Sequence, residues 1–124
     1  MSETHGTVSW NELNSNDIQK SLDYYTKLMG WTVQTVDMGM GDYHIFMKGD
    51  QMIGGASAIM PEMGEVPDHW LTYLNVDDVD ASVAETVAMG GKIINGPFDV
   101  PETGRMCILH DPTGAVVGLM TPEG

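Results

Sequence analysis

The sequence predicts an α+β fold of two tandem βαβββ modules that form a curved eight-stranded mixed sheet with the helices outside. An internal repeat is the main reason, because segment 12–30 matches segment 73–91 at an offset of 61 residues, as from Asn14 to Asn75. In each half, alternating apolar residues precede a helical pattern, and turn signals follow. We expect one domain over 1–124, with module one at 5–60, a linker at 61–68 and module two at 69–122.

The first half begins with an alternating, β-rich segment at 7–13. Asn16 or Asp17 can cap the helix that follows, and Gly30 ends it. The apolar residues of this helix recur every three or four positions and predict one buried stripe. The stripe consists of Ile18, Leu22, Tyr25, Leu28 and Met29. Three strands are expected at 31–38, 43–48 and 52–59, separated by turn signals at 39–42 and 48–51.

The second half repeats this plan from a strand at 69–76. Asp77 or Asp78 can cap its helix, and the glycine pair at 90–91 ends it. The expected buried stripe consists of Val79, Val83, Val87 and Met89. Three more strands are expected at 92–95, 104–110 and 115–120, with a tight turn at 111–114 before the last one.

The composition limits the classes of partner. A net charge of −13 disfavours nucleic acid and favours a cationic ligand. No apolar run reaches the ~20 residues of a membrane-spanning helix, so no membrane association is expected. The N-terminus shows no secretory signal, and the one cysteine, Cys107, excludes an intrachain disulfide. We therefore expect a cytoplasmic location, with Cys107 as a small buried hydrophobic residue.

Several segments carry a resemblance to a known family. The segments are 17–31, 76–83, Gly-Gly-Lys-Ile at 90–93 and Asp-Pro-Thr-Gly-Ala at 111–115. Together they resemble the vicinal oxygen chelate superfamily, which includes glyoxalase I, bleomycin-resistance proteins and extradiol dioxygenases. Shorter segments at 10–13, 69–73 and 104–107 resemble a glyoxalase-like subgroup of largely unassigned proteins. The resemblance implies a small-molecule site in the cleft between the two modules, and a homodimer.

The resemblance also implies which positions would hold the ligands of a metal ion. Metal-dependent members place ligands on the first and last strand of each module, and these positions fall on Trp10, Gly55, Leu71 and Gly118. None of these side chains can coordinate a metal. A register shift of two residues makes Glu12 and His69 weak metal candidates. We therefore expect no metal and no other cofactor, with a divalent metal as the alternative.

The positions without metal ligands predict a different kind of pocket. Glycines at 55 and 118 leave space where carboxylates would stand, and the aromatic rings of Trp10 and Tyr73 either line that space or fill the core. A planar or apolar ligand suits such a pocket. The predicted ligand-binding residues are Trp10, Glu12, Gly55, His69, Leu71, Tyr73, Arg105 and Gly118.

Glu12 is the candidate catalytic residue. In the alternating pattern of its strand, it falls on the inward-facing side, which is otherwise apolar. Its carboxyl group must therefore be paired with a cation, be hydrogen-bonded or have a raised pKa. A raised pKa would make it a general acid or base. Arg105, the one arginine, can pair with Glu12, bind an anionic ligand or have a structural role. The histidines are expected to be non-catalytic, with His44 exposed and His110 at the 111–114 turn.

These observations favour a metal-free small-molecule binding protein of the glyoxalase or bleomycin-resistance type, with a cationic or aromatic ligand. Two alternatives stay open. One is a metal-dependent lyase or dioxygenase of the same superfamily, and the other is a metal-free isomerase that uses Glu12 as acid or base. Whether the chain is an enzyme is therefore undecided by the sequence.

Overall fold

The computed structural model describes residues 2–37, 41–59 and 65–123. It contains eight strands and two helices, as the order β-α-β-β-β repeated once. The strands form a mixed sheet with the hydrogen-bonded order β2-β3-β4-β1-β5-β8-β7-β6. These findings confirm the predicted α+β class and the βαβββ repeat. The chain divides into two compact units, which we call the α1 unit (residues 11–70) and the α2 unit (residues 1–10 and 71–124).

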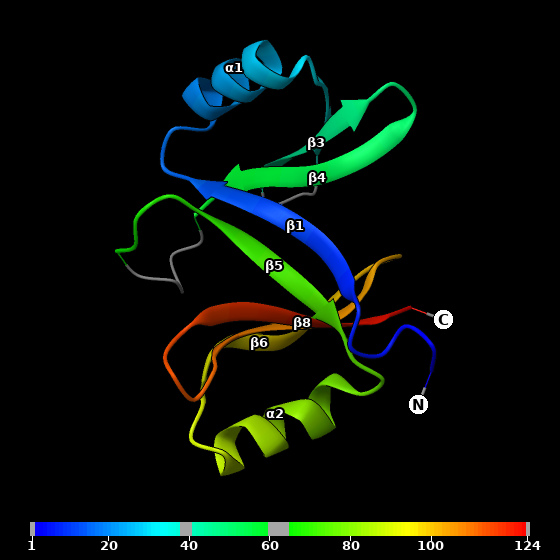
Figure 1. Cartoon of the computed structure of the whole chain (residues 1–124), viewed down its shortest axis with the longest axis vertical. Helices are drawn as coiled ribbons and strands as arrows, with labels where there is room; N and C mark the ends of the chain where they lie inside the picture. The colour runs from blue at the N-terminus through cyan, green and yellow to red at the C-terminus, as the bar shows by residue number, and fades with distance from the viewer. Residues whose placement is uncertain (1, 38–40, 60–64, 124) are drawn as a thin grey trace. The chain divides into compact units, whose positions relative to one another are not determined.

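In the α1 unit, helix α1 packs on one face of a set of strands (Figure 1). Strands β2, β3 and β4 are antiparallel, and β4 runs parallel to β1 with Glu12 opposite Gly55. The core between helix and strands consists of Leu13, Leu22, Phe46 and Ala56. The element bounds are β1 (Val8–Ser15), α1 (Ile18–Met29), β2 (Thr32–Asp37), β3 (Asp42–Lys48) and β4 (Gln51–Ala58).

Helix α1 begins and ends at residues that the sequence predicts. The Asp17 side chain accepts a hydrogen bond from the Lys20 backbone N–H at 3.2 Å, which satisfies a free donor of the first turn. Gly30 ends the helix in the left-handed conformation, with φ of 72°. The predicted stripe is too long, because Leu28 and Met29 are exposed. The packed part of the helix reaches only to Tyr25, so the last turn has no core to contact.

The α2 unit repeats this arrangement. Strands β6, β7 and β8 are antiparallel, and β8 runs parallel to β5 with Tyr73 opposite Gly118. Asp78 caps α2 through the Ala81 backbone N–H. The buried core consists of Val79 of α2 with Cys107, Leu109 and Leu119 of the strands, whereas Val87 and Met89 are exposed, contrary to the predicted stripe. The bounds are β5 (His69–Asn75), α2 (Val79–Ala88), β6 (Lys92–Val100), β7 (Gly104–His110) and β8 (Val116–Pro122).

Strand β6 is longer than the predicted segment 92–95. Its pairing with β7 shifts register between Ile93 and Asn95 and again between Asn95 and Phe98. These irregularities accommodate Pro97, which has no N–H to donate to a neighbouring strand. A β-bulge cannot be identified from the hydrophobic pattern alone, and the predicted strand therefore ends at Asn95, before Gly96 and Pro97.

The tight turn before β8 forms as predicted. An Asp111 carboxylate oxygen accepts hydrogen bonds from the backbone N–H groups of Thr113 at 2.8 Å and Ala115 at 3.0 Å. His110 lies beside it, with Nδ1 3.0 Å from the Gly114 carbonyl oxygen. An aspartate that bonds the backbone two residues on is typical of such turns.

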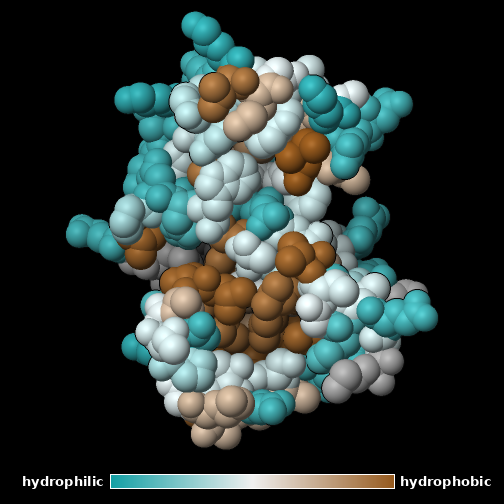
Figure 2. Space-filling model, in the orientation of Figure 1, coloured by the Kyte–Doolittle hydropathy of each residue, from teal (hydrophilic) through white to brown (hydrophobic). Residues whose placement is uncertain are grey.

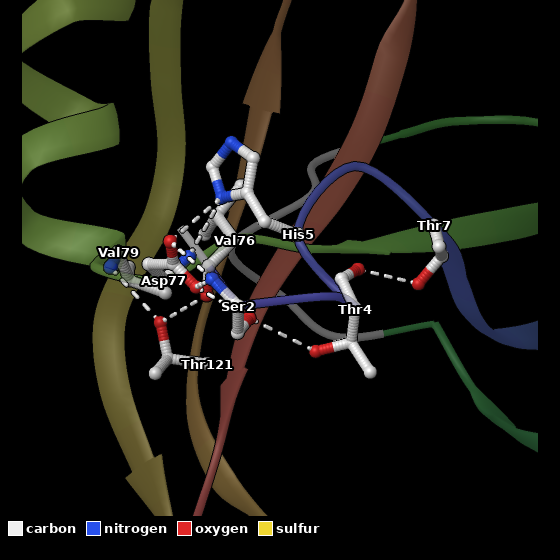
Figure 3. A network of polar contacts seen from close by, with 8 residues as sticks. All are labelled: Ser2, Thr4, His5, Thr7, Val76, Asp77, Val79 and Thr121. Atoms are coloured by element: carbon white, nitrogen blue, oxygen red, sulfur yellow. Dashed lines mark hydrogen bonds and ion pairs between the residues drawn. The ribbon is translucent and has the colours of Figure 1, made fainter.

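The N-terminal segment binds the loop before α2 (Figure 3). The Ser2 hydroxyl donates a hydrogen bond to the Asp77 carboxylate at 2.6 Å, and the Asp77 backbone N–H donates to His5 Nδ1 at 2.9 Å. The Gly6 N–H donates to the Asn75 carbonyl at 2.7 Å. The start of the chain is therefore fixed to the α2 unit by side-chain and backbone contacts.

Hydrophilic side chains project around the margin of the view in Figure 2, which fits the net charge of −13. Among the described residues, no helix is long and apolar enough to cross a membrane. Three predicted features lie partly or wholly outside the described residues. They are the strand end at residue 38, the turn at 39–42 and the linker at 61–68.

Candidate functional site

A polar cluster lies in the α1 unit, on the face of β1 that points away from α1. Leu13 points to the helix and belongs to the core, so its neighbours Glu12 and Asn14 point to the opposite face. Asn14 is 3% exposed, and Glu12 is half-buried. Tyr43 of β3 and His69 at the start of β5 complete the group. We call these four residues the Glu12 cluster.

Burial raises the pKa of the Glu12 carboxyl group, because the charged form loses solvation. Hydrogen bonding to the side chains of Tyr43 and Asn14 and the charge of His69 act in the opposite direction and offset part of this effect. The net result is a carboxyl group that keeps its proton to a higher pH than an ordinary glutamate. This confirms the inward position predicted for Glu12.

Two buried polar atoms beside Glu12 have no hydrogen-bond partner among the described residues. They are Asn14 Nδ2 and His69 Nε2. The Asn14 side chain is close enough to Glu12 to lower its pKa, but Nδ2 makes no hydrogen bond of full geometry. A buried polar atom without a partner costs about 1–3 kcal/mol, so proteins rarely retain one without a role. Two such atoms around one carboxyl group suggest a site that a ligand completes.

The other ring nitrogen of His69 determines what Nε2 can do. His69 Nδ1 lies 2.8 Å from the Pro67 carbonyl oxygen. A carbonyl oxygen can only accept, so Nδ1 carries the hydrogen. In the neutral imidazole, Nε2 is then a bare acceptor. With His69 neutral, the cluster therefore offers a ligand one donor, from Asn14, and one acceptor, from His69.

The residues of this cluster do not fit a bound metal. A catalytic zinc takes three protein ligands, and the cluster supplies only Glu12 and His69. Within the described part of the chain, no group of three or more His, Cys, Asp or Glu side chains could hold an ion. The weak candidates Glu12 and His69 thus form an incomplete set of metal ligands.

The structure corrects one prediction about the pocket. Gly118 does not leave space, because the ring of Tyr73 lies where a Cβ atom of residue 118 would stand. Tyr73 is 3% exposed and Leu71 is 1% exposed, so both are core residues of the α2 unit. Gly55 differs from Gly118, since it lies opposite Glu12 in the α1 unit. Trp10 is half-buried in the α2 unit.

Arg105 does not pair with Glu12, contrary to one of the hypotheses from the sequence. Its guanidinium group contacts Asp80 of α2 at 3.0 Å and Asp99 of β6 at 3.1 Å. Both carboxylates raise the pKa of the Arg105 guanidinium group above its ordinary value, so Arg105 stays charged. Its N–H donors already bond to two carboxylates, so Arg105 has a structural role, which was one of the three alternatives from the sequence.

Sequence reasoning does not identify Asn14 and Tyr43 as site residues. The sequence could have indicated Asn14, because it lies two residues from Glu12 and so on the same face of the strand. It could not have indicated Tyr43, because the position of Tyr43 near Glu12 depends on how β3, β4 and β1 pair. His44 is half-buried rather than exposed, and its Nδ1 lies 2.9 Å from the Thr35 hydroxyl.

The repeated modules define a protein of the vicinal oxygen chelate class. A family model described as the Glyoxalase/Bleomycin resistance protein/Dioxygenase superfamily matches residues 7–119. The chain therefore belongs to this superfamily, and the predicted resemblance is confirmed.

Curated relatives support the family at the level of sequence. CFP32 of Mycobacterium tuberculosis, a protein with a provisional glyoxylase name, is 37% identical over 118 residues, which cover 94% of this chain and 44% of CFP32. The anthracycline biosynthesis protein DnrV of Streptomyces peucetius is 32% identical over 126 residues, which cover 89% of this chain and 45% of DnrV. The chain thus spans less than half the length of either relative.

Solved structures support the fold. Methylmalonyl-CoA epimerase from Mycobacterium tuberculosis has a TM-score of 0.64 at 13% identity, over 100% of this chain and 93% of the epimerase. The hypothetical protein BH1468 from Bacillus halodurans has a TM-score of 0.66 at 12% identity, over 96% of each chain. At these identities the likeness concerns the fold alone.

Proposed function

We propose that the chain is a small-molecule binding protein whose ligand is held by the Glu12 cluster without a metal. The observation that carries the proposal is the pair of buried, unpartnered atoms, Asn14 Nδ2 and His69 Nε2, beside a carboxyl group of raised pKa. A ligand that satisfies both atoms gains hydrogen bonds at positions that are already desolvated. The cluster supplies too few metal ligands for a catalytic zinc, which supports binding without a metal.

The chemistry of the cluster selects the ligand. Asn14 Nδ2 would donate to a carbonyl oxygen, and His69 Nε2 would accept from a hydroxyl group. A planar ligand with adjacent carbonyl and hydroxyl groups meets both requirements. The acidic charge of the chain favours a cationic form of such a ligand. The name of the relative DnrV, an anthracycline biosynthesis protein, supports the same class.

Titration with daunorubicin, a planar and cationic anthracycline, tests this function by calorimetry. The variant Asn14→Leu removes the buried donor and leaves an apolar side chain of similar size. We expect it to fold at least as stably as the wild type, because an unpaired buried polar group is lost. We expect it to bind daunorubicin about tenfold more weakly, equal to ~1.4 kcal/mol.

The matched control is Asn75→Leu, which changes the corresponding position of the repeat in the α2 unit. This variant should bind daunorubicin as the wild type does. Equal affinity of Asn14→Leu and the wild type would contradict the placement at the Glu12 cluster. Failure of the wild type to bind daunorubicin would contradict the planar, cationic ligand class.

A second candidate function is acid–base catalysis by Glu12, and the raised pKa of its carboxyl group favours it. As a base beside an activated C–H bond, Glu12 would exchange that hydrogen with solvent. The test is deuterium incorporation next to the carbonyl group of small ketones and aldehydes. Glu12→Gln should lower such exchange at least about a hundredfold while binding of daunorubicin persists. No exchange by the wild-type protein would leave binding as the function.

The homodimer and the cytoplasmic location also belong to this proposal. The curated relatives are more than twice as long as their matched segments, which supports pairing of two copies of this chain. Sedimentation equilibrium would test the dimer, and a mass near 13.5 kDa would contradict it. Cell fractionation would test the location, which a single cysteine supports.

A further inference from the structure

A hollow lies in the α1 unit, on the α1 side of strand β1, and has a volume of about 510 Å³. Helix α1 forms one wall, and the start of β5 with the residue before it forms the other. The lining includes three aromatic side chains, Tyr24, Tyr25 and Trp70. It lies on the Leu13 face of β1, opposite Glu12 and Asn14, and shares one lining residue, His69, with the Glu12 cluster.

The three aromatic rings form two pairs, and the rings of each pair are nearly perpendicular. Tyr24 and Tyr25 meet at 83° with ring centroids 4.9 Å apart, and Tyr25 and Trp70 meet at 84° with centroids 5.3 Å apart. The Trp70 Nε1–H donates a hydrogen bond to the Tyr25 hydroxyl at 3.0 Å, which fixes the second pair. Tyr24 is 57% exposed and Trp70 is 40% exposed, so ring surface remains accessible.

Negative charge borders the same hollow. Asp17 and Asp68 line it, against a single cation, Lys20. Asp68 is held in place by the Asn16 backbone N–H and the Ser15 hydroxyl, each at 2.9 Å. These donors lower the pKa of the Asp68 carboxyl group, so it stays ionised at neutral pH. The electrostatic balance of the hollow therefore favours a cation.

The repeat provides an internal comparison. The α2 unit also has a hollow beside its helix, with a volume of about 260 Å³, whose other wall is formed by β7, β8 and the turn between them. Tyr24 and Tyr25 correspond there to Glu85 and Thr86, at the same offset as Asn14 and Asn75. Each unit thus has a hollow beside its helix, and of these two hollows the one in the α1 unit is lined by aromatic side chains. Tyr25 also packs against the core of its unit, whereas Tyr24 is 57% exposed.

We propose that the hollow of the α1 unit binds an organic ammonium ion, of the N-methylated or quaternary kind, against the faces of Tyr24 and Trp70. Aromatic faces attract such cations through their quadrupoles, and methylated ammonium groups are weakly hydrated enough to leave water. Asp17 and Asp68 supply the complementary charge. This site goes beyond the proposed function and uses neither Glu12 nor Asn14, although His69 of the Glu12 cluster also lines the hollow.

Choline and its neutral carbon isostere, 3,3-dimethyl-1-butanol, distinguish charge from shape. Proton–nitrogen NMR of the full chain follows the indole N–H signals of its 3 tryptophans, and Trp70→Phe identifies the signal of Trp70. At constant ionic strength, choline should shift the Trp70 signal with saturation, and the isostere should leave it in place. Tyr24→Leu should weaken choline binding about two- to fivefold, and Tyr24→Phe should retain it.

Asn14→Leu separates this site from the proposed function, because it should leave the choline affinity unchanged. An equal shift with the neutral isostere would overturn the proposal, since it would show binding by shape alone. An unchanged affinity in folded Tyr24→Leu would also overturn it. A choline response confined to signals of the α2 unit would place the cation elsewhere and reject the hollow.

Discussion

The ring of Tyr73 lies directly over Gly118 in the α2 unit, where it occupies the place of a Cβ atom. The two residues are opposite each other on the parallel strands β5 and β8. Gly118 therefore does not open a pocket, and its missing side chain is what lets the buried Tyr73 ring approach the strand so closely. The glycine and the tyrosine form one packing unit.

Gly118→Ala tests this packing. The new methyl group must displace the buried Tyr73 ring, so we expect a loss of about 1–3 kcal/mol in the free energy of unfolding. Urea denaturation measures this loss. In a Tyr73→Leu background the same glycine substitution should cost less, because the ring that the methyl group must displace is gone. An equal cost in both backgrounds would show that the ring is not the obstacle.

The raised pKa of Glu12 predicts a pH dependence of stability. The native state keeps the Glu12 proton at pH values where the unfolded chain has lost it. The free energy of unfolding therefore falls as pH rises from about 4.3, the ordinary pKa of glutamate, through the native pKa. Glu12→Gln carries no titrating proton, so the variant should lack this fall.

Urea unfolding of both proteins at a series of pH values measures the effect. The stability of Glu12→Gln minus that of the wild type should increase with pH and become constant above the native pKa. Glu85→Gln, at a helix position in the α2 unit, serves as the control. A difference that is flat or decreases with pH would mean that the carboxyl group is not desolvated in the native state.

Cys107 is predicted to resist thiol reagents in the native protein. The side chain is fully buried, and burial is the main cause that raises the pKa of its thiol group. The thiolate is the reactive form, so both accessibility and ionisation oppose the reaction. Labelling with a chromogenic disulfide reagent should be at least about a hundredfold slower in buffer than in urea. Rates within a few-fold of each other would contradict this burial.

The helix caps and the last turn were predictable because their signals are local. Asp17, Gly30 and Asp111 each act on backbone groups within four positions in the sequence. The pairing of Arg105 was not predictable in this way. Asp99 faces Arg105 only because β6 continues past its irregularities, where the hydrophobic pattern gives no strand signal.

The candidate site was predictable only in part for a similar reason. Strand parity places Glu12 on the inner face, since that depends on β1 alone. The contribution of Tyr43 requires the pairing of three strands, and that of His69 requires the course of the chain before β5. The aromatic hollow beside α1 depends on where Trp70 meets Tyr25, a contact between residues far apart in sequence.

Asp77 is predicted to anchor the N-terminal segment. Its carboxylate accepts from the Ser2 backbone N–H at 3.1 Å and from the Ser2 hydroxyl, and these bonds lower its pKa. Their contribution to stability is therefore present above about pH 3.9, the ordinary pKa of aspartate, and is lost as pH falls through the native pKa. At neutral pH, Asp77→Ala should free the segment without unfolding the α2 unit.

Amide hydrogen exchange at single-residue resolution checks this anchoring. The Gly6 N–H, which donates to the Asn75 carbonyl, should exchange about tenfold faster or more in Asp77→Ala. Amides of β7 in the α2 core should keep their wild-type protection. Asn16→Ala, the corresponding position of the repeat, is the matched control and should leave Gly6 exchange unchanged. If Gly6 stays fully protected in Asp77→Ala, the backbone contacts alone fix the segment, and the Asp77 carboxylate has no anchoring role.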